Sequence, residues 1–335
     1  MAEYNSINRN FAIDLTRFIA IILVITQHAW SMLDLDTDSW GFICYGYRAL
    51  VDRGVPLFIM ISGALLLNNS KYYGVFEFYK KRFSRILIPF VLWAFIIYVM
   101  SFIGNKYPTI HSEKEALINF FPFLFENKIG TFHWFVHMLF VLYLITPLLQ
   151  RALKESSKKF IESYFLVWIV GLLLQQFYPE LYLLHYISPL LKFTGLYVAG
   201  FYVITYLKNR QRNITIGGIG FISLYLMNVG LGLSHIPIHI FELAQTFCLF
   251  LCLSSIMVTK ESPITRIVTH VSRYSYTIYL IHIPFIYLLY TIRWETIIPL
   301  PIIPVITTVI VLFSSSIFCF ILDKCPFIPN KWVGI

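Results

Sequence analysis

The stretch FAIDLTRFIAIILVITQHAW, residues Phe11 to Trp30, decides the fold class of this chain. It has 20 residues, and an α-helix needs about 20 predominantly apolar residues to cross the hydrocarbon core of a bilayer. One basic residue, Arg9, precedes it, and no small-residue cleavage site follows Trp30. The apolar run is also too long for the core of a signal peptide. We therefore expect this stretch to be retained as a transmembrane helix.

Segments of the same kind recur along the whole sequence, with only short polar breaks between them. Of the 335 residues, 58% are apolar or aromatic and 13% are charged, which is more apolar surface than a water-soluble domain can bury. The sequence therefore predicts an all-α, polytopic membrane bundle, with residues 1–335 as a single domain. The ten predicted spans lie near residues 11–33, 48–67, 86–103, 132–150, 160–178, 185–206, 214–233, 238–258, 274–292 and 299–322.

The basic residues indicate the orientation of the chain, because Lys and Arg accumulate in cytoplasmic loops. With a cytoplasmic N-terminus, most of the 26 basic residues fall in cytoplasmic segments. The acidic residues Asp34, Asp36, Asp38 and Asp52 then fall outside, and ten spans leave both termini in the cytoplasm. Topology therefore explains the basic residues behind the net charge of +9 better than nucleic-acid binding does. Since the basic clusters lack stacking aromatics, we expect the lipid bilayer as a partner and no nucleic acid.

Neither the cysteines nor the histidines predict a metal site. The cysteines show no CxxC spacing, and at least three lie in apolar stretches where a thiol behaves as a small hydrophobic group; they are Cys44, Cys248, Cys252, Cys319 and Cys325. His133 and His137 stand at i and i+4, a spacing that can bind a metal, but no third ligand is evident nearby. We therefore expect no disulfide, no bound metal and no permanently bound cofactor.

The first helix carries a row of ionisable residues. Arg17 and His28 are eleven positions apart, or about 1100° of helical rotation, which returns to within about 20° of the same face. His28 lies about 16 Å further along the axis, toward the outer surface, and Asp14 is offset from it by about 40°. Because ionisable groups in hydrocarbon are costly, they usually face a bundle interior or a wet cavity. We interpret the row as catalytic, with a structural Asp14–Arg17 pair at i and i+3 as the alternative.

Four motifs in this order resemble the membrane-bound acyltransferase family 3. The first is the Arg17-to-His28 spacing, with ten intervening residues. The others are VPLFIMISGALLL (Val55 to Leu67), RFSR (Arg82 to Arg85) and YSYTIYLIHIPF (Tyr274 to Phe285). The resemblance covers essentially the whole chain, in the short form without an appended extracytoplasmic domain. It implies a bacterial inner-membrane enzyme similar to those that O-acetylate lipopolysaccharide O-antigen, common antigen or other surface polysaccharides.

The resemblance also implies roles for particular residues. The acyl donor would be cytoplasmic acetyl-CoA and the acceptor a glycan or lipid-linked saccharide. His28 is the candidate base on the acceptor hydroxyl, or a transient carrier of the acyl group. Arg17, Arg82 and Arg85 are the candidates for binding the phosphates of the donor. From spacing alone, Arg82 and Arg85 are equally well explained as positive-inside anchors.

Six further residues are weaker candidates for lining the substrate path. Ser62 precedes Gly63, and such a small pair more often serves close helix packing. His282 shares a helical face with Ser275 and is as well explained as a core histidine with satisfied hydrogen bonds. His133 and Trp134 would contact the sugar, and Glu242 would orient a histidine or an acceptor hydroxyl. The segment 104–131 is expected to lie on the outer membrane surface and to cover a site that opens outward.

Two other functions compete with O-acetyl transfer. A transporter or flippase for a polysaccharide or lipid-linked sugar would also place charges inside the membrane, but the sequence shows no inverted repeat and no paired broken helices. A haem-linked redox protein would use His133 and His137.

Overall fold

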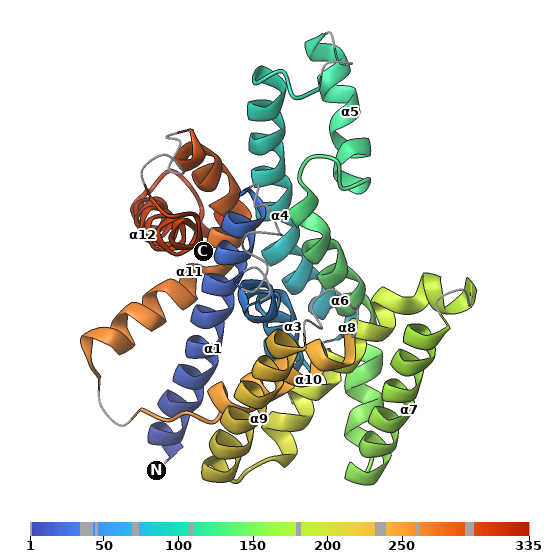
Figure 1. Ribbon diagram of the computed structural model, residues 1–335. Coiled ribbons are helices and arrows are strands. Elements are labelled where there is room, and N and C mark those ends of the chain that lie inside the picture. The colour runs from blue at the N-terminus through green and yellow to red at the C-terminus, as the bar shows by residue number, and fades with distance from the viewer. Residues whose placement is uncertain are drawn as a thin grey trace.

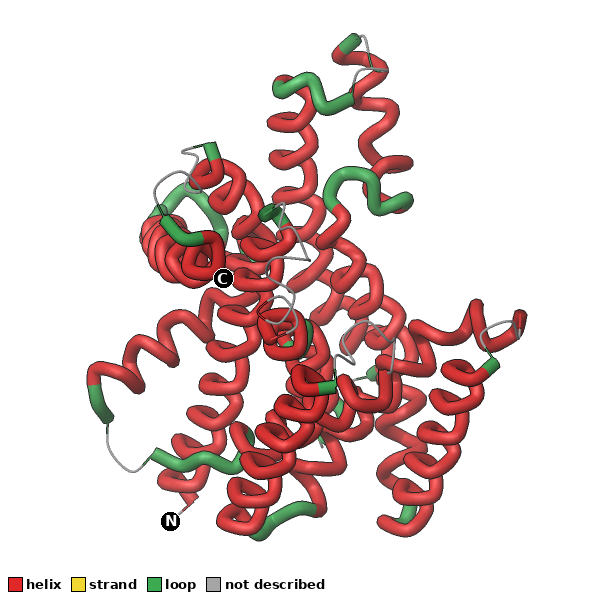
Figure 2. Tube along the Cα trace, viewed as in Figure 1, coloured by secondary structure: helices red, strands yellow, loops and turns green. Residues whose placement is uncertain are grey.

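The computed structural model describes residues 2–33, 43, 46–68, 74–107, 110, 112–178, 182–231, 239–258, 261–291 and 298–334. Within these ranges every regular element is a helix (Figure 2), so the all-α prediction is confirmed. The predicted outer residues Asp34, Asp36 and Asp38, and Cys44, lie outside the described residues.

The helices follow one another along the chain in the order shown in Figure 1. Their bounds are α1 (Ala2–Ser31), α3 (Gly54–Leu66), α4 (Val75–Ile103), α5 (Glu113–Phe125), η1 (Thr131–His133), α6 (Trp134–Glu155), α7 (Lys158–Phe177), α8 (Tyr182–Tyr206), α9 (Arg210–Gly230), α10 (His239–Leu253), α11 (Pro263–Tyr290), η4 (Leu300–Ile302), α12 (Ile303–Lys324) and α13 (Asn330–Val333).

Within the described residues, seven helices are long and apolar enough to cross a bilayer. Two shorter apolar helices, Leu190–Tyr206 and Ile240–Leu253, fall on two more of the predicted spans. The remaining predicted span, 274–292, lies on α11, whose first half carries Arg266 and Arg273. The chain is therefore a polytopic membrane protein, while the count of ten spans and the cytoplasmic position of both termini stay predictions.

Helix α1 runs through the middle of the molecule (Figure 1) and packs against α3, α10, α11 and α12. Its apolar residues Ala20, Ile21, Val24 and Ile25 have no exposed surface, as expected for a helix that is surrounded by other helices. Two of its ionisable side chains contact α11: Asp14 accepts a hydrogen bond from Ser272, and the ring of His28 lies 5.1 Å from that of His282.

Helices α3 and α8 approach each other closely through a reciprocal pair of glycines. A Cβ atom on Gly63 would stand 1.8 Å from the backbone oxygen of Tyr197, and one on Gly200 would stand 1.9 Å from that of Met60. No larger residue fits at either position without moving a helix, which is the usual role of small residues in membrane helix pairs. Gly63 therefore serves helix packing, and this packing sets the position of Ser62 beside it.

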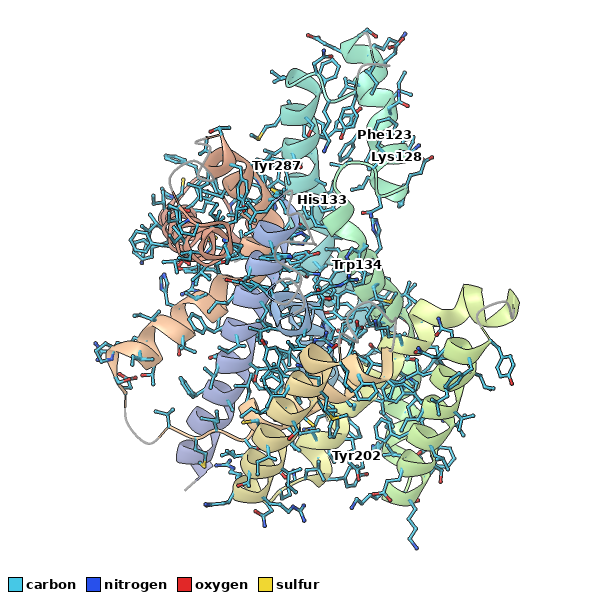
Figure 3. The ribbon with its side chains drawn as sticks, viewed as in Figure 1. Phe123, Lys128, His133, Trp134, Tyr202 and Tyr287 are labelled. Carbon is cyan, nitrogen blue, oxygen red and sulfur yellow. The ribbon has the colours of Figure 1, made fainter. Side chains whose placement is uncertain are left out.

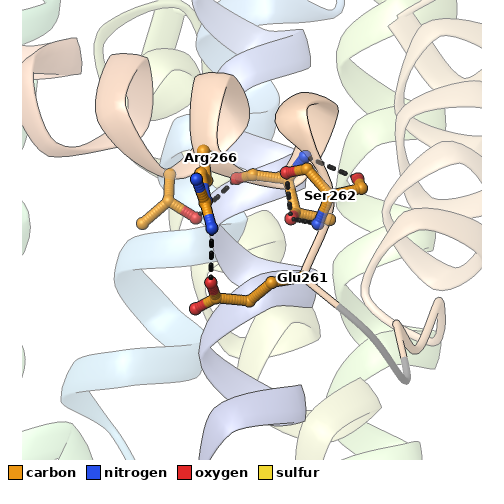
Figure 4. Close-up of polar contacts among 5 residues, drawn as sticks. Glu261, Ser262 and Arg266 are labelled. Carbon is orange, nitrogen blue, oxygen red and sulfur yellow. Dashed lines mark hydrogen bonds and ion pairs between the residues drawn. The ribbon is translucent and has the colours of Figure 1, made fainter.

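The start of α11 is fixed by a capping box (Figure 4). The Thr265 backbone N–H donates to Ser262 Oγ at 3.2 Å, and the Ser262 backbone N–H donates to Thr265 Oγ1 at 2.8 Å. Pro263 occupies the first turn, where a missing N–H costs nothing. Glu261 also pairs with Arg266 at 3.5 Å. With its first turn fixed in this way, α11 carries His282 about five turns further on.

Helix α5 forms within the segment that was expected to lie on the membrane surface, and it stands beside the far end of α4 in Figure 1. Phe120 is buried, with its ring 5.2 Å from that of Phe95. Other apolar side chains of α5 are exposed, namely Leu117, Ile118, Phe121 and Phe125. A helix with one buried and one exposed apolar face is suited to lie at the membrane interface. That α5 covers a site stays a prediction.

Candidate active site

Three histidines from three separate elements gather around the ring of Phe132. His28 comes from the last turn of α1, His282 from α11 and His133 from η1. The ring centroids of His28 and His282 are 5.1 Å apart. The Phe132 ring lies 6.3 Å from His28, 5.9 Å from His282 and 4.3 Å from His133. Figure 3 shows His133 where the chain enters α6.

A hydrogen bond to the backbone holds the ring of His282. His282 Nδ1 lies 2.6 Å from the carbonyl oxygen of Tyr279, and because a carbonyl only accepts, Nδ1 carries the proton. Nε2 of His282 then holds a lone pair and has no hydrogen-bond partner within the described residues. The Tyr279 hydroxyl donates to the carbonyl of Phe132, which ties η1 to α11.

The three imidazoles differ in how accessible they are. His282 has no exposed surface and His133 is 1% exposed, whereas His28 is only partly buried. Both ring nitrogens of His133 lack a partner within the described residues. Buried polar atoms are normally satisfied, so the cluster offers unpaired nitrogens at a partly accessible site. His28 is the most accessible member of the cluster.

A second cluster, the arginine cluster, lies near the middle of α1, about three turns before His28. Arg17 pairs with Asp14 at 3.2 Å, and Ser272 of α11 donates to the same Asp14 oxygen at 2.7 Å. Arg17 also lies within electrostatic range of Arg85 on α4. The structure thus contains the Asp14–Arg17 pair that the sequence allowed as an alternative, and it adds Ser272 as a further partner of the acid.

Tyr143 of α6 lies near all three arginines of the arginine cluster. Its hydroxyl interacts with the Ser62 side chain and lies within electrostatic range of Arg17, Arg82 and Arg85. Three guanidinium groups and one carboxylate leave a positive site, which favours an anionic ligand. Sequence reasoning named the three arginines and Ser62 but missed Tyr143 and Ser272. Single polar residues in apolar helices give no signal until helix packing is known.

The remaining sequence candidates lie apart from these two clusters or at their edges. Trp134 is 39% exposed and its ring lies 5.5 Å from that of Phe193 on α8. Ser275 is buried in α11. Glu242 pairs with Lys192 at 3.3 Å. The roles assigned to these residues stay predictions.

Helix α1 thus carries one member of each cluster, Arg17 and His28, inside a polytopic bundle of apolar helices. Residues 10–324 match the family model described as "Acyltransferase domain", of acyltransferase family 3, so the chain belongs to this family. It is 26% identical over 327 residues to the Bacillus subtilis (strain 168) protein named "Putative membrane-bound acyltransferase YfiQ", covering 89% of this chain and 86% of that protein. No solved structure matches the chain. The protein is a membrane acyltransferase.

Proposed function

We propose that this enzyme transfers an acetyl group from cytoplasmic acetyl-CoA to a hydroxyl of a cell-surface or lipid-linked glycan in the bacterial inner membrane. An O-antigen, a common antigen or another exopolysaccharide has the required chemistry. The observation that supports the proposal is that α1, an unbroken helix, carries one member of each cluster, Arg17 and His28. Arg17 and His28 are thereby held about 16 Å apart along the helix axis.

The arginine cluster suits the donor. The phosphates of acetyl-CoA are anionic, and guanidinium groups bind phosphate through forked, charge-assisted hydrogen bonds. Arg17 keeps 31% of its side-chain surface exposed despite its pairing with Asp14, so it remains reachable for a ligand. With the phosphates held at Arg17, Arg82 and Arg85, the thioester of a bound donor would extend along α1 toward His28.

The histidine cluster suits the chemistry of transfer. His28 would take the proton of the acceptor hydroxyl as its oxygen bonds to the acetyl carbonyl carbon. The carbon–sulfur bond then breaks, and the thiolate of CoA takes up the proton that the imidazole received. In the alternative path the acetyl group passes first to a nitrogen of His28 and then to the sugar. In either path the neutral His282 beside it would stabilise the charge that develops on His28.

The test is acetyl transfer by the purified protein in lipid nanodiscs, with radiolabelled acetyl-CoA and de-O-acetylated surface glycan of the host bacterium. We expect label in the glycan with the wild-type protein and none with His28→Ala at equal amounts of inserted protein. His270→Ala is the matched control, because His270 is an exposed histidine of α11 outside the cluster.

The wild-type result tests the transfer reaction, and the His28→Ala result tests the role of His28. A wild-type protein that leaves the glycan unlabelled overturns the proposed function. Full transfer by His28→Ala overturns the role of His28 and leaves the transfer reaction standing.

A further inference from the structure

A third polar cluster, with two fully buried members and four partly buried ones, lies at the same end of α1 as His28. Gln27, the neighbour of His28, donates from Nε2 to Asp52 Oδ1 at 3.0 Å. Arg53, the N-cap residue of α3, is within electrostatic range of both Asp52 and Glu242. The other members are Lys192 of α8, which pairs with Glu242, and Gln245, one turn along α10 from Glu242. We call these six residues the outer polar cluster.

Two members of the outer polar cluster have polar atoms without partners. Arg53 is 1% exposed, and its Nε and Nη1 have no hydrogen-bond partner within the described residues. Gln245 has no exposed surface, and neither its amide nitrogen nor its amide oxygen has a partner there. Unpaired polar groups in a protein interior are rare and cost stability. We therefore expect Arg53 and Gln245 to have a role other than stabilising the fold.

A purely structural role explains only part of the cluster. The Gln27–Asp52 hydrogen bond and the Lys192–Glu242 ion pair join α1 to the start of α3 and α8 to α10. Gln245 adds nothing to these links, because it carries no charge and makes no hydrogen bond with the described residues. An apolar side chain at this position would pack without leaving a polar group unsatisfied.

The chemistry of the unpaired groups identifies the kind of ligand. Arg53 offers only donors, whereas the amide of Gln245 offers both donors and an acceptor. The carboxylates of Asp52 and Glu242 supply further acceptors nearby. A single anion would use the donors alone. A ligand with several hydroxyls, each able to donate and to accept, can use both the donors and the acceptors of the cluster.

We propose that the outer polar cluster is the acceptor subsite, in which Arg53 and Gln245 bind hydroxyl groups of the glycan. This inference rests on the proposed function, since it assigns that reaction's acceptor. Gln27 and His28 are successive residues of α1, about 1.5 Å apart along the axis and about 100° apart around it. A sugar bound in the subsite therefore lies at the level of the imidazole that activates its neighbouring hydroxyl.

The test is a steady-state kinetic comparison in nanodiscs, with acetyl-CoA and de-O-acetylated surface glycan each varied in turn. Gln245→Leu removes both unpaired amide groups at nearly constant volume. We expect the KM for glycan to rise by about tenfold or more, because hydroxyls brought into the site lose their partners. The KM for acetyl-CoA stays unchanged and the Tm does not fall. Arg53→Lys, which keeps the charge but removes the planar donors, raises the KM for glycan in the same way.

Thr246→Val is the matched control on α10. Thr246 is equally buried, but its hydroxyl is satisfied by the Glu242 carbonyl at 2.8 Å, so its loss leaves both KM values unchanged. If the KM for glycan is unchanged in Gln245→Leu, the acceptor subsite is overturned and the proposed function stands. The same conclusion follows if this variant lowers only the Tm and kcat. If Arg53→Lys fails to fold, Gln245→Leu decides the question. A wild-type protein that acetylates no glycan overturns the proposed function itself.

Discussion

The rings of His28 and His282 lie 5.1 Å apart between centroids, but the two residues differ in burial and in hydrogen bonding. His28 is partly accessible, whereas His282 is fully buried with its Nδ1 proton directed to a backbone carbonyl. That hydrogen bond fixes the tautomer, so the lone pair of His282 sits on Nε2. The proposed reaction therefore gives the two residues different roles, with His28 acting on the substrate and His282 stabilising His28.

The His282→Asn variant tests this division at the scale of one residue. The Asn amide can still donate to the Tyr279 carbonyl, but the Nε2 lone pair is lost. We expect kcat for acetyl transfer to fall by about 10²-fold, with the KM for acetyl-CoA and the Tm nearly unchanged. Steady-state kinetics and thermal unfolding in detergent measure these quantities. Wild-type kcat in this variant would show that His282 is only a core residue.

Arg17 gives the corresponding prediction for the donor. In Arg17→Gln one charge-assisted contact to phosphate is lost, and such a bond contributes about 1.5–3 kcal/mol. We therefore expect the KM for acetyl-CoA to rise by roughly 10- to 100-fold, with the KM for glycan unchanged. Lys80→Gln is the control, since Lys80 is an exposed cation in the first turns of α4. A similar rise in both variants would mean that the arginines act only as a diffuse positive surface.

Among the elements, the α3–α8 pair holds the arginine cluster in place, because Ser62 on α3 lies against Tyr143 on α6. Gly63→Ala puts a methyl group into the Tyr197 backbone. Such overpacking typically costs about 1–3 kcal/mol, so we expect a clear fall in Tm. Gly74→Ala is the control, since nothing lies within 4 Å of its Cβ position. Equal Tm values for the two variants would contradict the close approach of α3 and α8.

The helices also show where sequence reasoning was sufficient. The periodicity of α1 predicted that Arg17 and His28 share a face, because that relation depends only on helix geometry. It did not predict that His28, His133 and His282 meet, since contacts between distant helices depend on packing angles and register. Arg53 is a clear case. It is buried at the N-terminus of α3 and lies within electrostatic range of Glu242 on α10, a contact that depends on how the helices pack.

At the scale of the whole molecule, the proposed reaction needs the arginine cluster to face the cytoplasm and the histidine cluster to face outward. The family match and the helical bundle establish a membrane acyltransferase, and the motifs were enough to predict that. The sidedness depends on the distribution of Lys and Arg alone. It is the premise that connects a cytoplasmic donor to a glycan on the outer side.

Labelling of single cysteines in whole cells tests that premise. In a background with the native cysteines replaced by alanine, Glu113→Cys lies at the start of α5 and Lys158→Cys at the start of α7, both exposed. A membrane-impermeant maleimide should label the first in intact spheroplasts and the second only after permeabilisation. Lys158 pairs with Glu162 at the surface, where an ion pair contributes little, so its loss does not disturb the fold. The reverse labelling pattern would place the arginine cluster outside, where cytoplasmic acetyl-CoA cannot reach it.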